Sequence, residues 1–416
     1  MSPHRPFRSW ILACAGSALA ACAGASGASR PATYGGQELS PPRDAGAPAA
    51  SPALAAEPRG TKAYLALCAG PAHSALQVKL WEGDALTPVG GPVPSNGRCA
   101  PPSLQLDPAG QPVVAFEEGG PDHARIQVRR WDGSAWRAVG PPLIQEAEER
   151  ASSPAIALGK GGAPWVAWEE SRGDAILVLV ARLDGEVWRP VGRAVNGSPG
   201  PAGTGTPALA LDSTGAPVVA WQDGRSRTVR ISRLEGEEWE DMGAPLQEPG
   251  ATVGRAPALA LDPAGYVLAA FVLERGAERA VPVLRWDGRS WGEVGEPIPA
   301  GQAAAAVSRP ALATDRWGVP VVAFPRGGAV PALLLSRWDG DGWSDPNQPI
   351  DGDAAGGVSP ALGVLGDGTV LVGWQEPPDA ARSRVRVRRG APAPRAVAPA
   401  WRPDPDAPAE GGEEQR

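Results

Sequence analysis

The sequence predicts an all-β protein that folds as a seven-bladed β-propeller of four-stranded antiparallel blades. Two observations predict it. A pattern of four short strand-like segments recurs along the 416 residues, and the proline that opens each copy returns every 50 to 53 residues, at Pro52, Pro102, Pro154, Pro207, Pro257, Pro310 and Pro360. Self-similarity at this period indicates a repeat architecture, and four strands per repeat are typical of propeller blades. We therefore expect one propeller over residues 51–401.

The first two segments of each repeat are expected to lie near the axis of the ring. Pro257–Asp262 is an example of the first and Pro217–Trp221 of the second, and both are apolar on both faces. Strands buried on both faces have this composition. An Asp-x-x-Gly turn joins them, as in residues 107–110, where glycine supplies the positive φ that the turn needs.

The third and fourth segments are expected to form an outer hairpin. The third alternates polar and apolar residues, so one of its faces is solvated. A Trp-Asp-Gly-x-x-Trp turn follows it in three copies, with the pairs Trp131 and Trp136, Trp286 and Trp291, and Trp338 and Trp343. Elsewhere leucine replaces one partner, as in Leu183 opposite Trp188, so we interpret these pairs as packing between blades rather than as a sugar platform. The seventh copy lacks this hairpin, and two modes of ring closure remain open: a strand exchanged between the termini, or direct packing of blade one on blade seven.

The N-terminus predicts export. Residues 1–8 are basic, and residues 9–21 form an apolar run too short to span a bilayer as a helix. Leu19-Ala20-Ala21-Cys22 resembles a bacterial lipobox, which implies a signal peptide over residues 1–21, lipidation of Cys22 and an anchor in the cell envelope. Ala23 after the cysteine favours the outer membrane, by resemblance to enterobacterial sorting. A plain secretory signal with an incidental cysteine is the alternative.

The segments outside the repeats are expected to be disordered. Residues 22–50 are rich in Ala, Gly, Ser and Pro and predict a linker between the anchor and the propeller. Residues 402–416 are acidic and proline-rich and predict a disordered tail.

The composition favours some function classes over others. A net charge of −7 with no basic block argues against a nucleic-acid partner. The sequence contains no HExxH motif and no Walker loop, and after the signal peptide its histidines are His73 and His123. We therefore predict no cofactor, no metal site and no catalytic residue, and we expect a monomer.

The loops that connect the second segment to the third, and each repeat to the next, vary in length and content. Variable loops on a rigid scaffold often carry recognition. Four acids just past the second segments, Glu118, Glu170, Asp223 and Glu376, are candidates for a ring around the mouth of the central channel. We favour the alternative that they solvate strand ends and pair with nearby arginines such as Arg172. Cys68 and Cys99 lie on the same face and predict a disulfide in an exported protein, with free thiols as the alternative.

The repeats weakly resemble two groups of propellers. The Asp-Gly-x-x-Trp hairpin resembles a shortened Asp-box of sialidase-type propellers, which implies an arginine triad and a tyrosine nucleophile. The tyrosines of this chain are Tyr34, Tyr64 and Tyr266, and Tyr34 falls in the linker, so those catalytic residues do not carry over. The order of Trp-Asp-Gly-x-x-Trp, Gly and Ser-x-Pro-Ala resembles the repeats of seven-bladed bacterial lectins, which implies sugar binding between blades but assigns no residue here.

The function predicted from these observations is a non-catalytic scaffold on the membrane. It would bind an unknown protein or cell-wall partner on the variable loops. A carbohydrate-binding lectin is the first alternative, and a sialidase-like glycoside hydrolase is the second.

Overall fold

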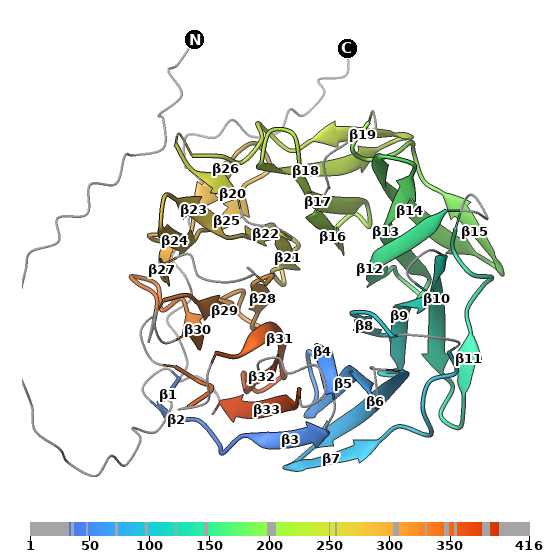
Figure 1. Cartoon of the computed structure of the whole chain (residues 1–416), viewed down its shortest axis with the longest axis horizontal. Helices are drawn as coiled ribbons and strands as arrows, with labels where there is room; N and C mark the ends of the chain where they lie inside the picture. Colours follow the sequence, from blue (N-terminus) through green and yellow to red (C-terminus); the bar gives the residue numbers. More distant parts are fainter. Residues whose placement is uncertain are drawn as a thin grey trace, which may run out of the picture.

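The computed structural model describes residues 33–34, 37–46, 49–70, 74–95, 99–120, 123–144, 149–197, 205–248, 250–253, 256–302, 308–328, 331–344, 349–352, 356–376 and 383–390. The regular elements in these ranges are all β-strands, and their sheets surround a central opening (Figure 1). The prediction of an all-β propeller is confirmed. Across the same ranges, no helix is long and apolar enough to cross a membrane.

Blades one to four each contain four antiparallel strands in chain order, which we call A to D from the channel outward. Blade one consists of β4 (Ala49–Ala56), β5 (Lys62–Ala69), β6 (Ala75–Glu82) and β7 (Ala85–Pro88). Blade two consists of β8 (Ser103–Leu106), β9 (Pro112–Gly119), β10 (Ala124–Trp131) and β11 (Trp136–Ala138). Blade three consists of β12 (Arg150–Leu158), β13 (Pro164–Arg172), β14 (Ala175–Asp184) and β15 (Val187–Pro190). Blade four consists of β16 (Gly205–Leu211), β17 (Pro217–Asp223), β18 (Thr228–Glu235) and β19 (Glu238–Asp241).

Blades five and six depart from this regular form. Blade five is divided into two sheets, one of β21 (Ala258–Leu261), β22 (Val267–Ala270), β25 (Val283–Trp286) and β26 (Trp291–Glu293), and one of β20 (Thr252–Val253), β23 (Leu273–Arg275), β24 (Glu278–Val281) and β27 (Ile298–Gln302). Blade six has β28 (Ala311–Thr314), β29 (Pro320–Arg326) and β30 (Ala332–Arg337), and a single bridge between Trp338 and Trp343 takes the place of strand D. With blade five counted once, the ring has seven blades.

Blade seven closes the ring with a strand from the other end of the chain. β31 (Val358–Val364), β32 (Val370–Gln375) and β33 (Val385–Gly390) are completed by β3 (Arg43–Gly46), which pairs antiparallel with β33. The segment before it forms a short hairpin of β1 (Thr33–Tyr34) and β2 (Gln37–Glu38). Closure therefore exchanges a strand between the termini, the first of the two modes left open by the sequence.

The linker predicted over residues 22–50 is therefore wrong at its C-terminal end. Ala45 is buried, and its carbonyl accepts a hydrogen bond of 2.5 Å from Lys79 Nζ of blade one. The strand was not predicted because this segment has no alternation of polar and apolar residues. Its Ala and Gly residues are small enough to pack at the outer edge of blade seven. Residues 1–32 and 391–416 lie outside the described ranges, so the signal peptide, the lipidation of Cys22 and the acidic tail stay predictions.

Tryptophans of the outer hairpins lie between neighbouring blades. The indole rings of Trp131 and Trp136 have centroids 5.6 Å apart, and the other two double-Trp hairpins have the same arrangement. In five blades the tryptophan at the second position of the hairpin donates its Nε1–H to a backbone oxygen of the preceding blade. These residues are Trp136, Trp188, Trp239, Trp291 and Trp343. The pairs thus pack blade against blade.

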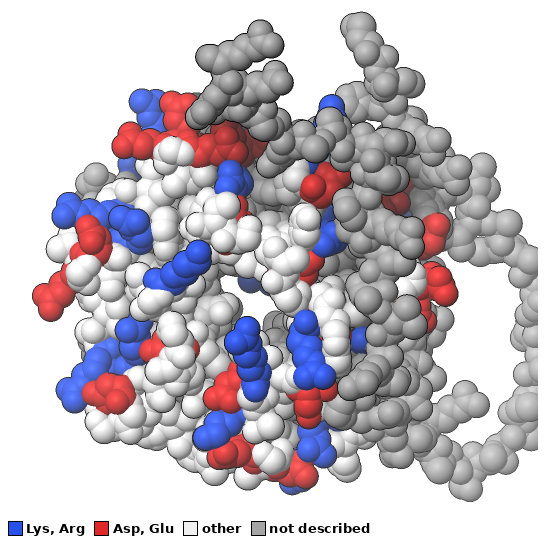
Figure 2. All heavy atoms as spheres, turned by 180° about the vertical axis from the view of Figure 1, so that it is seen from behind, with Lys and Arg blue, Asp and Glu red and all other residues white. Residues whose placement is uncertain are grey.

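The connections divide between two faces of the ring. Because the strands are antiparallel, the A–B and C–D turns share one face, which we call the turn face, and the B–C and D–A loops share the opposite face, the loop face. Figure 2 shows the molecule from behind, with its centre hollowed and with acidic and basic side chains lying next to one another over the surface.

Candidate functional site at the mouth of the central channel

The first residues of the A strands surround a cavity at the loop-face end of the channel. Its volume is about 590 Å³, which lies in the range of ligand pockets. The residue directly before the repeated proline lines this cavity in every blade, and we call these residues the rim: Ser51, Pro101, Ser153, Thr206, Ala256, Arg309 and Ser359. A second cavity of about 700 Å³ continues the channel toward the turn face, and Leu54, Gln105 and Leu362 line both.

Four rim residues have an unusual backbone conformation. Ser51, Ser153, Ala256 and Ser359 have φ values of 53°, 55°, 61° and 51°. A non-glycine residue in this region costs about 1–3 kcal/mol, and the following proline restricts it further. At the three serines the pairing of strands A and B also shifts register, which marks β-bulges. Bulges and strain of this kind concentrate at functional sites.

Arg309 reaches from blade six to blade four at this mouth. Its Nη2 donates hydrogen bonds to the backbone oxygens of Thr206, at 3.3 Å, and Pro207, at 2.8 Å. The rim residue of the intervening blade is Ala256, whose methyl group is small enough for the arginine to pass. Burial lowers the pKa of Arg309 to about 10, and the negative charge of Glu169 opposes the shift. The Nε of Arg309 is buried and has no hydrogen-bond partner in the described part of the chain.

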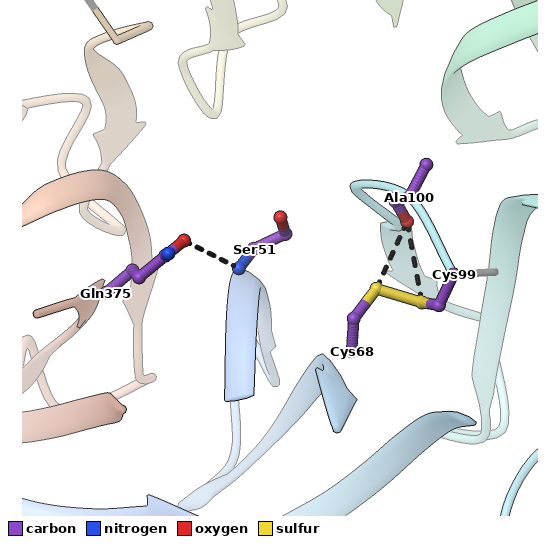
Figure 3. The surroundings of a disulfide bond; sticks show 5 residues. All are labelled: Ser51, Cys68, Cys99, Ala100 and Gln375. Atoms are coloured by element: carbon purple, nitrogen blue, oxygen red, sulfur yellow. Dashed lines mark hydrogen bonds between the residues drawn. A yellow bond between two sulfur atoms is a disulfide. The ribbon is translucent and has the colours of Figure 1, made fainter. Parts of the chain in front are cut away.

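The residue after the last large apolar residue of strand B forms a second ring, which we call the tie position. It is occupied by Cys68, Glu117, Glu169, Gln222, Val272, Pro325 and Gln375. In four blades this residue connects its blade to the next one, by the Cys68–Cys99 disulfide, the Glu117–Arg150 ion pair at 2.5 Å, a hydrogen bond of 2.7 Å from Gln222 Nε2 to the Val253 oxygen, and a hydrogen bond of 3.2 Å from the Ser51 N–H to Gln375 Oε1. Figure 3 shows the first and last of these ties, with both cysteine sulfurs near the backbone oxygen of Ala100.

Glu117 and Glu169 bring two buried carboxyl groups to this region from adjacent blades. Glu117 lines the cavity and is 8% exposed, and Glu169 is 9% exposed and lies close enough to act on the charge of Arg309. The site therefore combines hydroxyl groups, carboxylates and a desolvated guanidinium around one cavity.

The four predicted acids do not line this cavity. Glu118 accepts a hydrogen bond from Gln127, and Glu376 accepts one from Arg386. Asp223 caps its own loop by accepting backbone N–H bonds from Arg225 and Ser226. Each acid is held by a partner from its own blade.

Glu170 shows most clearly why these acids do not form the site. It is completely buried and accepts hydrogen bonds from Trp168 Nε1 and Arg172 Nη2. Strand B continues past the predicted end, and successive residues of a strand point to opposite faces. The candidate ring of acids is therefore not formed, since the preceding residues occupy the tie position. The alternative that we favoured, pairing with a nearby arginine, is present between Glu170 and Arg172.

The rim and the tie position were missed although the sequence contains a signal for both. The rim residue always precedes the repeated proline, and the tie residue always follows the last large apolar residue of strand B, so both could have been read from the aligned repeats. No group of three or more His, Cys, Asp and Glu side chains that could hold a metal ion occurs among the residues that the structure describes.

Comparisons with known proteins give matches in structure only. No family model matches the sequence, and no curated protein matches it. A polysaccharide lyase, an ulvan lyase bound to a GlcA–Rha3S saccharide, has a TM-score of 0.50 and 12% identity, covering 83% of this chain and 93% of its own. An α-L-arabinanase of Penicillium chrysogenum complexed with arabinobiose has a TM-score of 0.46 and 15% identity, covering 72% and 95%. A sialidase, Hadza microbial sialidase Hz136, has a TM-score of 0.47 and 14% identity, covering 76% and 73%.

At these identities the similarity concerns the fold. The interpretation of the chain as a non-catalytic scaffold for a protein or cell-wall partner is nevertheless contradicted by the match to the ulvan lyase, a protein named for its action on a polysaccharide. This match gives no support to the prediction that the chain lacks catalytic activity.

Proposed function

We propose that the protein is a carbohydrate-active propeller that binds a glycan at the mouth of its central channel. The observation that carries this proposal is the cavity of about 590 Å³, which residues of all seven blades line and to which they contribute hydroxyl groups, a carboxylate and a guanidinium. A sugar presents hydroxyl groups that both donate and accept hydrogen bonds, so it suits a wall that mixes donors with acceptors. The proline and alanine side chains between the polar groups suit the apolar C–H faces of a sugar ring.

Three features support this proposal. The rim serines have a strained backbone with φ values of 51° to 55°, and strain of this kind concentrates at functional sites. Arg309 has a buried Nε–H without a partner in the described ranges, and a ligand oxygen could accept from it. The similar solved structures are of a polysaccharide lyase, an arabinanase and a sialidase.

A glycan array with the purified full-length protein tests the proposal. Arg309→Met keeps the length of the side chain and removes its charge and its donors, and we expect it to weaken binding of the selected glycan at least tenfold. Arg137→Met, which changes an exposed arginine on the outer strand β11, is the matched control and should bind like the wild type. An array without any bound glycan, or equal affinity of Arg309→Met and wild type, would overturn the proposal.

A second candidate function is glycoside hydrolysis at the same mouth, favoured by the buried acids Glu117 and Glu169. Glycosidases use a pair of carboxyl groups, one of them in an apolar environment that raises its pKa. Release of reducing ends from the bound glycan would support hydrolysis if Glu117→Gln and Glu169→Gln each reduce the rate at least 100-fold while binding persists. Binding without release of reducing ends would leave a lectin.

A further inference from the structure

The A–B turn of blade six differs from the other six in having two large side chains at positions that the turn itself does not need. Blades two and five have Asp-Pro-Ala-Gly and blade four has Asp-Ser-Thr-Gly, whereas blade six has Asp315-Arg316-Trp317-Gly318. The backbone of this turn is the same as in the others. The Gly318 N–H donates to the Asp315 oxygen at 2.9 Å, and Asp315 Oδ1 accepts from the N–H groups of Trp317 and Val319. The two large side chains therefore require a reason other than turn formation.

Arg316 and Trp317 form one wall of a groove between blades five and six on the turn face. The groove has a volume of about 390 Å³. Trp338 of the outer hairpin extends the wall of blade six, and Arg285 and Glu293 line the opposite side from blade five. A groove of this size accommodates one or two sugar rings.

An arginine stacks on an aromatic ring at the A–B turn of blade six and directly after the A–B turn of blade five. The guanidinium of Arg316 lies 4.2 Å from the ring centroid of Trp317, and its Nη1 donates to the Gly366 oxygen of blade seven at 3.0 Å. The guanidinium of Arg285 lies 4.0 Å from the ring centroid of Tyr266, which is 38% exposed. Such stacking fixes the orientation of an exposed aromatic ring before any ligand arrives.

The charges that line the groove balance. Arg285 is paired with Asp262, with 2.6 Å between Nη2 and Oδ2, and Arg316 and Glu293 contribute one charge of each sign. Burial, followed by the charge of Glu296, raises the pKa of Glu293. A neutral ligand with hydroxyl groups satisfies these donors and acceptors without leaving a charge unpaired.

We propose that this groove is a second carbohydrate site, specific for a neutral sugar, on the face opposite to the channel mouth. The half-buried rings of Trp317 and Trp338 contact the apolar side of the sugar. Arg285, Arg316 and Glu293 hydrogen-bond its hydroxyl groups. The site goes beyond the channel-mouth proposal because no rim residue takes part in it.

The repeat itself supplies the test variant. Arg316→Pro combined with Trp317→Ala converts the turn to the Asp-Pro-Ala-Gly sequence of blades two and five, so the fold should be retained. Ser213→Pro combined with Thr214→Ala makes the same conversion in blade four, at residues that do not line the groove, and serves as the control. An array of neutral and acidic oligosaccharides is probed with the full-length wild type, both turn variants and Arg309→Met.

We expect the Arg316→Pro, Trp317→Ala variant to lose at least tenfold in affinity for one set of neutral oligosaccharides, which Arg309→Met and the blade-four control still bind. A blade-six variant that binds every oligosaccharide as the wild type does would overturn the proposal. So would a loss confined to acidic oligosaccharides, because the groove would then select a charge. If Arg309→Met binds every oligosaccharide as the wild type does while the blade-six variant loses affinity, the channel-mouth proposal is overturned and the groove proposal is supported.

Discussion

Two sets of contacts join neighbouring blades, and they use the repeat in opposite ways. At the outer edge of the ring the same contact recurs, with an indole N–H of one blade donating to a backbone oxygen of the preceding blade. At the channel mouth the tie position makes a disulfide, an ion pair or an amide hydrogen bond, depending on the blade.

The difference separates what the ring needs from what a site needs. The contact at the outer edge has the same form at five junctions, and a tryptophan with a short turn is sufficient for it. The tie position requires only that neighbouring blades be joined, so its side chains can differ and can make the mouth asymmetric. An asymmetric mouth can select one orientation of a ligand, which a ring of seven identical residues cannot do.

The largest expected effect concerns blade seven, which lacks the outer hairpin of the other copies and is completed by β3. Deleting residues 1–46 removes β3, exposes the edge of β33 and removes the partner of Lys79. An unpaired edge strand promotes aggregation, so we expect a chain that is largely insoluble or has lost its cooperative thermal transition. Deleting residues 1–32 is the control and should unfold as the full-length chain does. A cooperative transition in the shorter chain within about 2 °C of the control would show that blade seven closes without β3.

The disulfide is expected to be the strongest of the ties at the mouth. It joins residues separated by 31 positions, and removing it should cost about 3–4 kcal/mol in the chain-entropy account. The measurement is urea unfolding of Cys68→Ala, Cys99→Ala against the wild type under oxidising conditions, with both repeated in reductant. Both proteins should have the same midpoint in reductant. A difference under 1 kcal/mol in oxidising buffer would mean that the other contacts between blades one and two already hold the joint.

A glycine at the end of the outer strand makes the tryptophan contact possible. Gly295 has φ +66°, and a Cβ there would lie 2.2 Å from Trp338. Gly236 has φ +65° with no atom within 4 Å of the same position. Both alanine substitutions add backbone strain, but Gly295→Ala also displaces the indole, so we expect it to be about 1–3 kcal/mol less stable than Gly236→Ala. Equal unfolding free energies for the two variants would argue against tight packing at the outer edge.

The sequence was sufficient for the fold because its strongest signals are local and repeated. The proline period, the Asp-x-x-Gly turns and the tryptophan hairpins each depend on residues within one blade. The closing strand β3 could not be recognised, because four residues of Arg-Asp-Ala-Gly composition have no strand pattern and pair with a segment over 300 positions away. The candidate ring of acids is not formed, because period-two alternation makes the face of a side chain depend on where the strand ends. The arginine pairing that we favoured instead could be read from neighbouring residues, as in Glu170 and Arg172.

A single hydrogen bond at the mouth is expected to matter less than the disulfide. Gln222→Leu leaves the Val253 oxygen without the donor at 2.7 Å, in a buried position. The loss should be about 1 kcal/mol, since an unsatisfied buried acceptor costs roughly that much. Gln302→Leu changes an exposed glutamine of β27 and should alter the unfolding free energy by less than about 0.5 kcal/mol. Equal values for the two variants would mean that water replaces the missing donor.

The smallest expected effect is the response of the outer turns to acid. Asp339 accepts backbone N–H bonds from Asp341, at 2.9 Å, and Gly342, at 2.8 Å, and these bonds hold its pKa below the ordinary value. A pKa that is lower in the folded than in the unfolded state adds stability above the unfolded value, near 3.9, and this stability is lost as the pH falls through the folded value. The wild-type Tm should therefore fall below about pH 4. Asp339→Asn keeps one acceptor oxygen without titrating, so its Tm should fall less between pH 5 and pH 3. An equal fall in both proteins would assign acid sensitivity to carboxylates other than Asp339, with Asp287 in the equivalent turn of blade five as the next to substitute.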